Sequence, residues 1–186
     1  MQHDDDVLHF DSSAAGGNGL RVTQVRGREG ISRCFRFDID LVSDGTMAIS
    51  TPDMLKQGAT LVIEQGESRN AKQKRYIHGI LAEFEARGQG EHAASFHAVL
   101  VPRMWVLGMG RRTRVFVDKS VKDIIEAVFA SAKITTADYE FRTTGTYTPR
   151  DHTVQYQESD LGFVTRLMEH EGMFSFFVHD EKATKM

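Results

Sequence analysis

Four carboxylates in the segment from Val154 to Phe177, VQYQESDLGFVTRLMEHEGMFSFF, are of a type that could carry acid–base chemistry: Glu158, Asp160, Glu169 and Glu171. A hydrolase with paired carboxylates needs two such groups at a set separation across one cleft. The middle of the segment has the pattern of a helix, which would put the first two and the last two carboxylates about 16 Å apart, at ~1.5 Å per residue over roughly eleven residues. We therefore expect these side chains to favour the helix ends and solvent. We predict no catalytic residue among them.

Histidine is the other residue type that could support a site here, as a metal ligand. None of the eight histidines forms an H-E-x-x-H or similar ligand pair. His92 and His97 are five residues apart, which in a strand places them on opposite faces. We predict no metal site and no cofactor-binding residue, and expect dispersed surface or structural roles for His3, His9, His78, His92, His97, His152, His170 and His179.

Three further features could suggest chemistry. Cys34 is the single cysteine, so it forms no internal disulfide, and its place in an expected strand over Ser32–Leu41 favours packing over nucleophilic chemistry. The stretch Gly108–Arg112, GMGRR, lacks the phosphate-loop pattern and is predicted to be a turn. Arg111, Arg112 and Arg114 form a basic cluster, either a solvated strand face or a contact to an acidic neighbouring chain.

Composition excludes several classes of protein. The chain has 186 residues, a formal net charge of -3, 40% hydrophobic and 26% charged residues, which are ordinary values for a globular protein. Such a balance gives no field that would attract nucleic acid or an anionic membrane. The N-terminus, MQHDDDVLHF, is acidic where a secretory signal needs a basic region, and no stretch approaches the roughly 20 apolar residues of a membrane span.

The first half is predicted to be β-structure. Residues 19–27 and 31–43 alternate as two half-buried strands joined by a turn at Gly27–Gly30. One face of the second strand holds Phe35, Phe37, Ile39 and Leu41. A short helical turn capped by Thr51 follows, then strands over residues 59–65, 75–87 and 92–102, with loops expected at 66–74 and 88–91. Trp105 lies in the next segment, Pro102–Leu107, and is expected in a core or an interface.

The second half adds two amphipathic helices. The first lies within residues 118–134 with Ser120 and Asp123 as a capping box, and its apolar stripe is Val121, Ile124, Ile125, Val128, Phe129 and Ala132. One or two strands are predicted within residues 136–158. The second helix begins at Ser159, ends before Gly172 and has the apolar face Phe163, Val164, Leu167 and Met168. A strand over residues 173–180, with Phe174, Phe176 and Val178 on one side, completes an α+β protein.

Four segments carry a family resemblance: RYIHGILAEFE, AVLVPRMWVL, DKSVKDIIEAVF and YTPRDHTVQYQESDLGFVTRLMEHEGMFSFFVH. Together they resemble the N-terminal region of the VgrG family, the spike proteins of the bacterial type VI secretion system, which is similar in turn to the tail hub of contractile phages. The likeness runs from about Leu20 to His179, and the last segment is the most specific. Gly162 departs from the family, which usually has an acidic residue there, and smaller departures fall at Val117, Arg103–Met104 and Ser175.

The resemblance implies β-barrel-like modules of the tail-hub type. Residues 1–114 would form a first module, incomplete until strands from beyond residue 186 are added, and residues 115–186 would begin a truncated second α+β module. The chain would be one third of a homotrimeric base that docks on the hexameric Hcp tube beside baseplate proteins. A spike-tip protein and effectors would attach through C-terminal parts absent here.

The resemblance also implies where the protein acts and what it does not do. It would assemble in the bacterial cytoplasm and leave through the type VI system, to the exterior or into target cells. It would have no enzymatic activity, no cofactor, no nucleic-acid partner and no membrane insertion. Two alternatives stay open: the hub of a phage or phage-derived contractile tail and, from another class, a hydrolytic effector.

Overall fold

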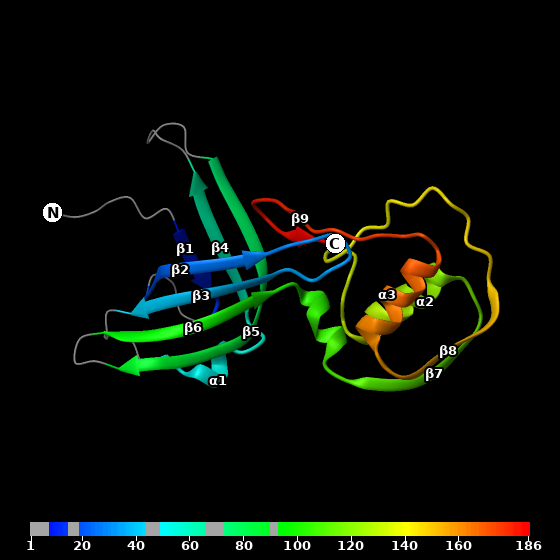
Figure 1. Ribbon diagram of the computed structural model, residues 1–186, viewed down its shortest axis with the longest axis horizontal. Helices are drawn as coiled ribbons and strands as arrows, with labels where there is room; N and C mark the ends of the chain where they lie inside the picture. The colour runs from blue at the N-terminus through cyan, green and yellow to red at the C-terminus, as the bar shows by residue number, and fades with distance from the viewer. Residues whose placement is uncertain (1–7, 15–18, 44–48, 66–72, 90–92) are drawn as a thin grey trace. The chain divides into compact units, whose positions relative to one another are not determined.

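The structure, a computed structural model, describes residues 8–14, 19–43, 49–65, 73–89 and 93–186. The chain forms two compact units, and each is made from separate stretches of sequence. The first unit takes Met1–Glu29, Phe35–Pro102 and Val178–Thr184, and the second takes Gly30–Cys34, Arg103–Phe177 and Lys185–Met186. The mixed α+β content and the two helices in the second half agree with the sequence (Figure 1).

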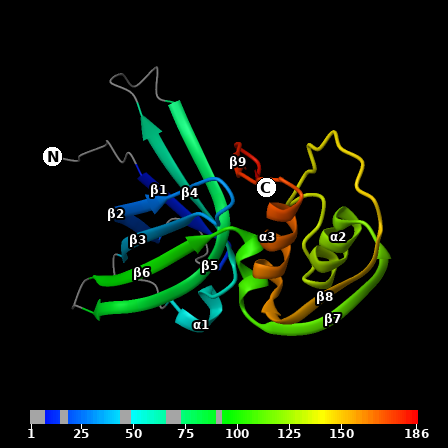
Figure 2. The same ribbon diagram turned by 45° about the vertical axis from the view of Figure 1, so that its right-hand side comes forward.

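The first unit is a closed antiparallel barrel with strand order β1-β2-β3-β6-β5-β4. Its strands are β1 (Leu8–Ser12), β2 (Leu20–Arg28), β3 (Arg36–Ser43), β4 (Gly58–Gln65), β5 (Gln73–Gln89) and β6 (Ala94–Val101). Pairing of β1 with β4 closes the ring, from Leu8 opposite Ile63 to Ser12 opposite Ala59. The sequence led us to expect further strands from beyond residue 186, whereas strands within residues 8–101 close this barrel by themselves (Figure 2).

Alternation along the strands fills the barrel interior. Phe35, at the entry to β3, and Phe37, Ile39 and Leu41 within it are all buried, as their shared face predicted. Leu61 of β4 is buried as well, as are several residues of β5 and β6, including Ile77, Leu81, Phe84, Phe96, Ala98 and Leu100. Each such aliphatic or aromatic side chain removed from water contributes roughly 1.5–3 kcal/mol toward folding.

Gly27 lies inside β2 rather than in the turn that the sequence indicated. It pairs with Phe37 of β3, and a Cβ added to Gly27 would lie 2.2 Å from the Phe37 ring. The glycine is therefore required because the aromatic ring occupies the space of a side chain. The turn follows at Ile31–Arg33, after the predicted position at Gly27–Gly30.

Smaller differences occur elsewhere in the first unit. Helix α1 (Thr51–Met54) has Ser50 at its cap position, so the expected cap Thr51 is its first helical residue. The loop predicted at 66–74 and the turn at 88–91 lie largely outside the described residues.

The second unit packs two helices on one face of a two-stranded sheet (Figures 1 and 2). Its elements are the 3-10 helix η1 (Arg103–Gly108), β7 (Arg111–Lys119), α2 (Val121–Ser131), β8 (Arg150–Ser159) and α3 (Asp160–His170). Strands β7 and β8 are antiparallel, with Val115 opposite Val154. Because β7 belongs here, residues 103–114, which the sequence placed in the first module, belong to the second unit.

Both helices present their predicted apolar faces to one core. It contains Met104, Leu107, Val121, Ile124, Ile125, Val128, Phe129, Ile134, Phe163, Val164 and Leu167. Ala132 and Met168 are partly buried against it, and Trp105 on η1 is half-buried. The amphipathic pattern of each helix was therefore a reliable guide to its packing.

Capping residues also follow the prediction. The Ser120 hydroxyl accepts a hydrogen bond from the Asp123 amide at 3.2 Å, and the Asp123 carboxylate accepts one from the Ser120 amide at 3.1 Å. The Ser159 hydroxyl accepts from the Gly162 amide at 3.0 Å. Gly172 has φ +68°, which suits a residue just past the end of α3.

Two predicted strands are wrong in extent. Residues 136–149 form turns and irregular chain, and β8 starts directly after Pro149, which has no amide hydrogen for a ladder. Residues 173–177 are irregular, and only Val178–His179 (β9) is a strand, paired with β10 (Thr184–Lys185). Two hydrogen bonds join Ser175 to Ser32 where a sheet partner was expected: the Ser32 amide donates to the Ser175 carbonyl at 2.7 Å, and the Ser175 amide donates to the Ser32 hydroxyl at 3.4 Å.

Candidate functional site

Asp160, one of the four candidate carboxylates, lies at the start of α3 and is 4% exposed. Its Oδ1 accepts hydrogen bonds from Arg114 Nη2 at 2.6 Å and from Gln155 Nε2 at 2.8 Å. Arg112 Nε lies 3.4 Å from the other carboxylate oxygen. The carboxylate is therefore fully engaged by β7 and β8, and it faces no open cleft.

Gln155 on β8 completes this buried polar cluster. Its side chain is fully buried, its Oε1 accepts from Arg114 Nε at 2.9 Å, and its Nε2 also donates to the Glu158 carbonyl at 3.1 Å. Because buried polar groups are costly unless every donor and acceptor is paired, this cluster fixes one arrangement of β7, β8 and α3.

Ion pairs also engage other members of the acidic set. Glu158 accepts from Arg166 Nη2 at 2.6 Å, and Glu171 forms an ion pair with Arg150. The carboxylates at the two ends of α3 are thus tied to different arginines and do not converge on one substrate position. That no residue is catalytic stays a prediction.

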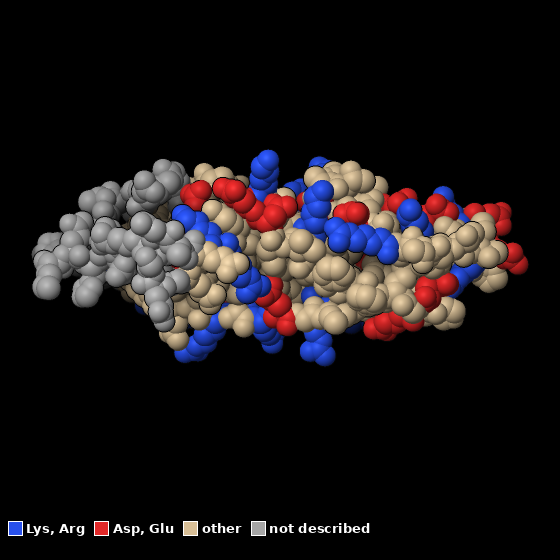
Figure 3. Space-filling model, turned by 90° about the horizontal axis from the view of Figure 1, so that it is seen from above, with Lys and Arg blue, Asp and Glu red and all other residues tan. Residues whose placement is uncertain are grey.

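The basic cluster on β7 mostly serves the unit itself. Arg112 and Arg114 hold Asp160, and Arg111 Nη1 donates to the Gln157 carbonyl at 3.1 Å. Lys/Arg and Asp/Glu side chains are interspersed on the face of the protein in Figure 3, with no large area of one sign.

Histidines do not gather into a metal site in the described part of the chain. Over those residues no three His, Cys, Asp or Glu side chains are placed to hold a metal ion. His97 Nδ1 instead lies 2.8 Å from Asp40, and His179 Nε2 lies 2.7 Å from Glu29. His3 and His92 lie outside the described residues.

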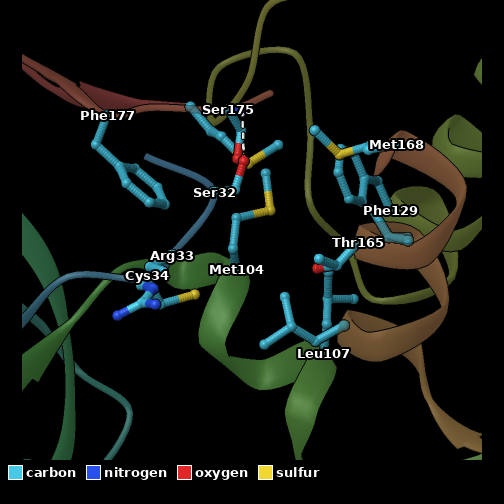
Figure 4. Close-up of a pocket in the computed structure, with 13 residues that line it drawn as sticks. Ser32, Arg33, Cys34, Met104, Leu107, Phe129, Thr165, Met168, Ser175 and Phe177 are labelled. Atoms are coloured by element: carbon cyan, nitrogen blue, oxygen red, sulfur yellow. Dashed lines mark hydrogen bonds between the residues drawn. The ribbon is translucent and has the colours of Figure 1, made fainter. Parts of the chain in front are cut away.

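Cys34 lines a small cavity of the second unit, with a volume of about 30 Å³. Met104 and Leu107 reach the cavity from η1, Phe129 from α2 and Met168 from α3 (Figure 4). Pockets for metabolites and drugs have roughly 300–1,000 Å³, so this space is about the size of a water molecule. Burial raises the pKa of the Cys34 thiol to about 11, which disfavours the thiolate that nucleophilic chemistry requires.

The outer face of β7 and β8 is apolar and exposed. Val115 and Val117 on β7 are 59% and 58% exposed, and Val154 and Tyr156 on β8 are 42% and 67% exposed. Val115 pairs directly with Val154, while the alternate residues Thr153 and Gln155 of β8 are buried toward the helices. We call Val115, Val117, Val154 and Tyr156 the apolar sheet face. Contiguous exposed apolar side chains of this kind mark interaction sites.

Sequence reasoning missed both the Asp160 cluster and the apolar sheet face. The sequence signal for the face was the alternation Val115–Phe116–Val117. Only the pairing of Val115 with Val154 shows which side of the sheet is exposed. The signal for the cluster was spread over three elements and was not local in the sequence.

No helix in the described residues combines the length and apolar character needed to cross a membrane.

Comparisons with known proteins place the chain among tail hubs and spikes. The family model described as phage tail baseplate hub (GPD) matches residues 28–186. The type VI secretion system spike protein VgrG1c of Pseudomonas aeruginosa is 33% identical over 177 residues, covering 95% of this chain and 23% of that protein. The chain thus spans about a quarter of the length of this relative.

Solved structures give the same picture of the fold. The E. coli c3393 protein is described as a component of the type VI secretion system with structural similarity to the T4 bacteriophage tail proteins gp27 and gp5. It matches with a TM-score of 0.73 and 26% identity, over 90% of this chain and 48% of that one. The 43 kDa tail protein of prophage MuSo2 from Shewanella oneidensis has a TM-score of 0.56 and 13% identity, over 89% of this chain and 49% of that one, and shows the fold alone. These matches confirm the resemblance to VgrG spikes and the hub-type fold.

Proposed function

Because the chain belongs to the phage tail baseplate hub (GPD) family, we propose that it is a structural spike and hub component of the type VI secretion system. The observation that carries this proposal is the match of 95% of the chain to a type VI spike protein. The hub-like fold over 90% of the chain supports it. The proposal gives these residues a mechanical role and no catalytic one.

In the finer form of the proposal, three copies build the base of the spike. The two units are hub modules, the second continuing beyond residue 186, and the base docks on the hexameric Hcp tube next to baseplate proteins. It assembles in the bacterial cytoplasm and is propelled outward or into target cells. Further parts of the longer protein carry the tip protein and effectors.

Physical requirements of such an assembly fit the two units. A ring of subunits needs rigid scaffolds and specific contacts of about 800 Å² per partner, rather than reactive side chains. The closed barrel supplies a scaffold without open sheet edges, and the apolar sheet face supplies a surface suited to burial by a second copy.

Solution mass and tube binding test the proposal together. Sedimentation velocity should show a concentration-dependent trimer, and the protein should co-sediment with purified Hcp rings. A strict monomer that also fails to bind Hcp would refute the proposal.

A phage or phage-derived tail hub is the second candidate. The family description and the prophage tail-protein fold favour it. Neighbouring genes for capsid and tail fibres would support this candidate, whereas genes for sheath, Hcp and a secretion ATPase would support the type VI role.

A further inference from the structure

The hairpin formed by β9 and β10 contacts β5 of the barrel, and His78 of β5 makes the hydrogen bonds to it. The His78 amide donates to Thr184 Oγ1 at 3.1 Å, and its Nε2 lies 3.1 Å from the Asp180 carbonyl and 3.2 Å from the Glu181 carbonyl. Carbonyl oxygens only accept hydrogen bonds, so Nε2 of His78 carries the proton. Its Nδ1, 2.9 Å from Thr60 Oγ1, is then the acceptor of the Thr60 hydroxyl.

A second histidine, His179, lies within the same attachment. Its side chain is 7% exposed, and its ring centroid lies 5.3 Å from that of Phe35, a residue of the barrel core. Nε2 of His179 lies 2.7 Å from Glu29 Oε1, and Nδ1 lies 2.8 Å from Thr184 Oγ1. Arg75 of β5 forms an ion pair with the other oxygen of Glu29.

The donors and acceptors of these hydrogen bonds can be assigned in one consistent way. The Thr184 hydroxyl oxygen accepts from the His78 amide, so its own hydrogen can be donated to Nδ1 of His179. Nε2 of His179 then carries the single ring proton and donates it to Glu29. The network is complete when His179 is neutral. A second proton on Nδ1 would turn two donors toward Thr184 and displace its hydroxyl hydrogen.

Charged and titratable groups face His179 from each element around it. Glu29 follows β2, Arg75 and His78 come from β5, and Asp180 is the next residue of the hairpin, where its carboxylate accepts from the Lys182 and Ala183 amides at 2.7 Å each. Arg75 already pairs with Glu29 and reduces the attraction that Glu29 would exert on a charged imidazole.

We propose that the hairpin of residues 178–185 is a pH-sensitive clasp, closed on the barrel while His179 is neutral and loosened when His179 takes up a second proton. The residues that carry the clasp, Glu29, Arg75, His78, His179 and Thr184, all belong to the first unit. The proposal goes beyond the proposed function.

The sign of the pH dependence follows from the surroundings of His179. Burial lowers the pKa of His179 from its usual 6.5, and the hydrogen bond to Glu29 opposes that effect without cancelling it. The closed state therefore binds fewer protons, and its stabilisation is fully present above about pH 6.5 and is lost as the pH falls through the lowered pKa. For Glu29, burial would raise the pKa, but hydrogen bonds from Arg75 and His179 lower it below the usual 4.5. The stabilisation that ionised Glu29 contributes is therefore lost only below about pH 4.5.

Amide hydrogen exchange on the 186-residue protein tests the clasp, at about pH 7.5 and about pH 5.5, above the range where Glu29 titrates. The reporters are the amides of His78 and Asp180, which bond Thr184 Oγ1 and the Ala183 carbonyl. Leu81, whose amide bonds the Gln57 carbonyl, is the reference within the barrel. After correction for intrinsic rates, reporter protection should fall at the lower pH, by up to about tenfold for each unit by which the pKa of His179 is lowered. Leu81 should not change, and equal reporter protection at both pH values would overturn the proposal.

His179→Gln provides the matched variant because its amide can hydrogen-bond but does not titrate. Its reporters should show no loss between the two pH values, whereas His152→Gln, at an exposed position on β8, should behave as the native protein. A pH-dependent loss retained in His179→Gln would contradict the clasp. The native protein gives an independent check by NMR: the His179 ring should be protonated at Nε2 and titrate below 6.5, and a titration at or above 6.5 would contradict the proposal.

Discussion

The outer faces of the barrel and of the β7–β8 sheet differ in what they show to water. On the barrel, Arg36 pairs with Asp38 at 2.9 Å and with Glu83 at 3.1 Å, and His97 lies 2.8 Å from Asp40. On the β7–β8 sheet, the outward positions include the four residues of the apolar sheet face, with His152 opposite Val117. Both sheets bury one face against their own core, so the difference lies only in the face turned away from it.

The charged outer face of the barrel is well solvated, whereas the exposed apolar face of the β7–β8 sheet is suited to burial by a partner. On the barrel these outward positions carry ion pairs, whereas the apolar sheet face has Val115 opposite Val154, with Val117 and Tyr156 also exposed. Aromatic and apolar side chains without charges are typical of the core of an interface. The carboxylates of the second unit meanwhile hold arginines in place. We infer that assembly contacts fall on the apolar sheet face, and that the charged groups beneath it stabilise the fold.

The largest effect is expected from Asp160→Ala. The substitution leaves the Arg114 guanidinium and the Gln155 amide without their buried acceptor. The free energy of unfolding, measured by urea denaturation, should fall by about 3–5 kcal/mol. Glu158→Ala is the matched control, because its partner Arg166 is 53% exposed, and should cost at most about 1 kcal/mol. Equal costs for the two variants would show that the buried cluster does not stabilise the unit.

Removing a buried side chain of the second unit comes next. Ile125→Ala on α2 or Leu167→Ala on α3 should each lower the free energy of unfolding by about 2–5 kcal/mol, because both side chains are almost fully buried. Val115→Ala on the apolar sheet face should change it by no more than about 0.5 kcal/mol. Unchanged thermal midpoints for both buried positions would mean that the helices are not packed as described.

Val115→Asp should have the smallest effect on stability and a clear effect on assembly. The added charge stays in water in the isolated chain, so its unfolding free energy should shift by about 0.5 kcal/mol or less. In a contact with a second copy the carboxylate would be buried without a partner, which is unfavourable. Self-association measured by sedimentation should therefore weaken. Thr23→Asp on the exposed barrel face is the control and should leave association unchanged; association weakened equally by both would place the contact elsewhere.

Local patterns predicted much of the fold. The stripe through Ile124 and Phe129, the capping box at Ser120 and the buried face around Ile39 depend on neighbours within a few residues, and the structure has all of them. The end of α3 at Gly172 is likewise a local property of backbone conformation.

Features that depend on distant partners could not be predicted. Gly27 was assigned to a turn because the Phe37 ring that requires it lies on the neighbouring strand. Residues 173–177 alternate like a strand, but a strand also needs a partner strand, and in the described chain Ser175 bonds to the amide and the hydroxyl of Ser32 instead. Asp160 looked like a simple helix-start charge because its partner Arg114 is far away in sequence.

Photo-crosslinking at Tyr156 tests most directly the claim that the apolar sheet face is an assembly surface. A benzoylphenylalanine placed there, in the protein expressed in a bacterium with an active type VI system, should crosslink on irradiation to a second copy of the same protein. The same group at Thr23 should give no such product. The claim would be contradicted if Tyr156 crosslinked to no protein, or if only the Thr23 position crosslinked to a second copy.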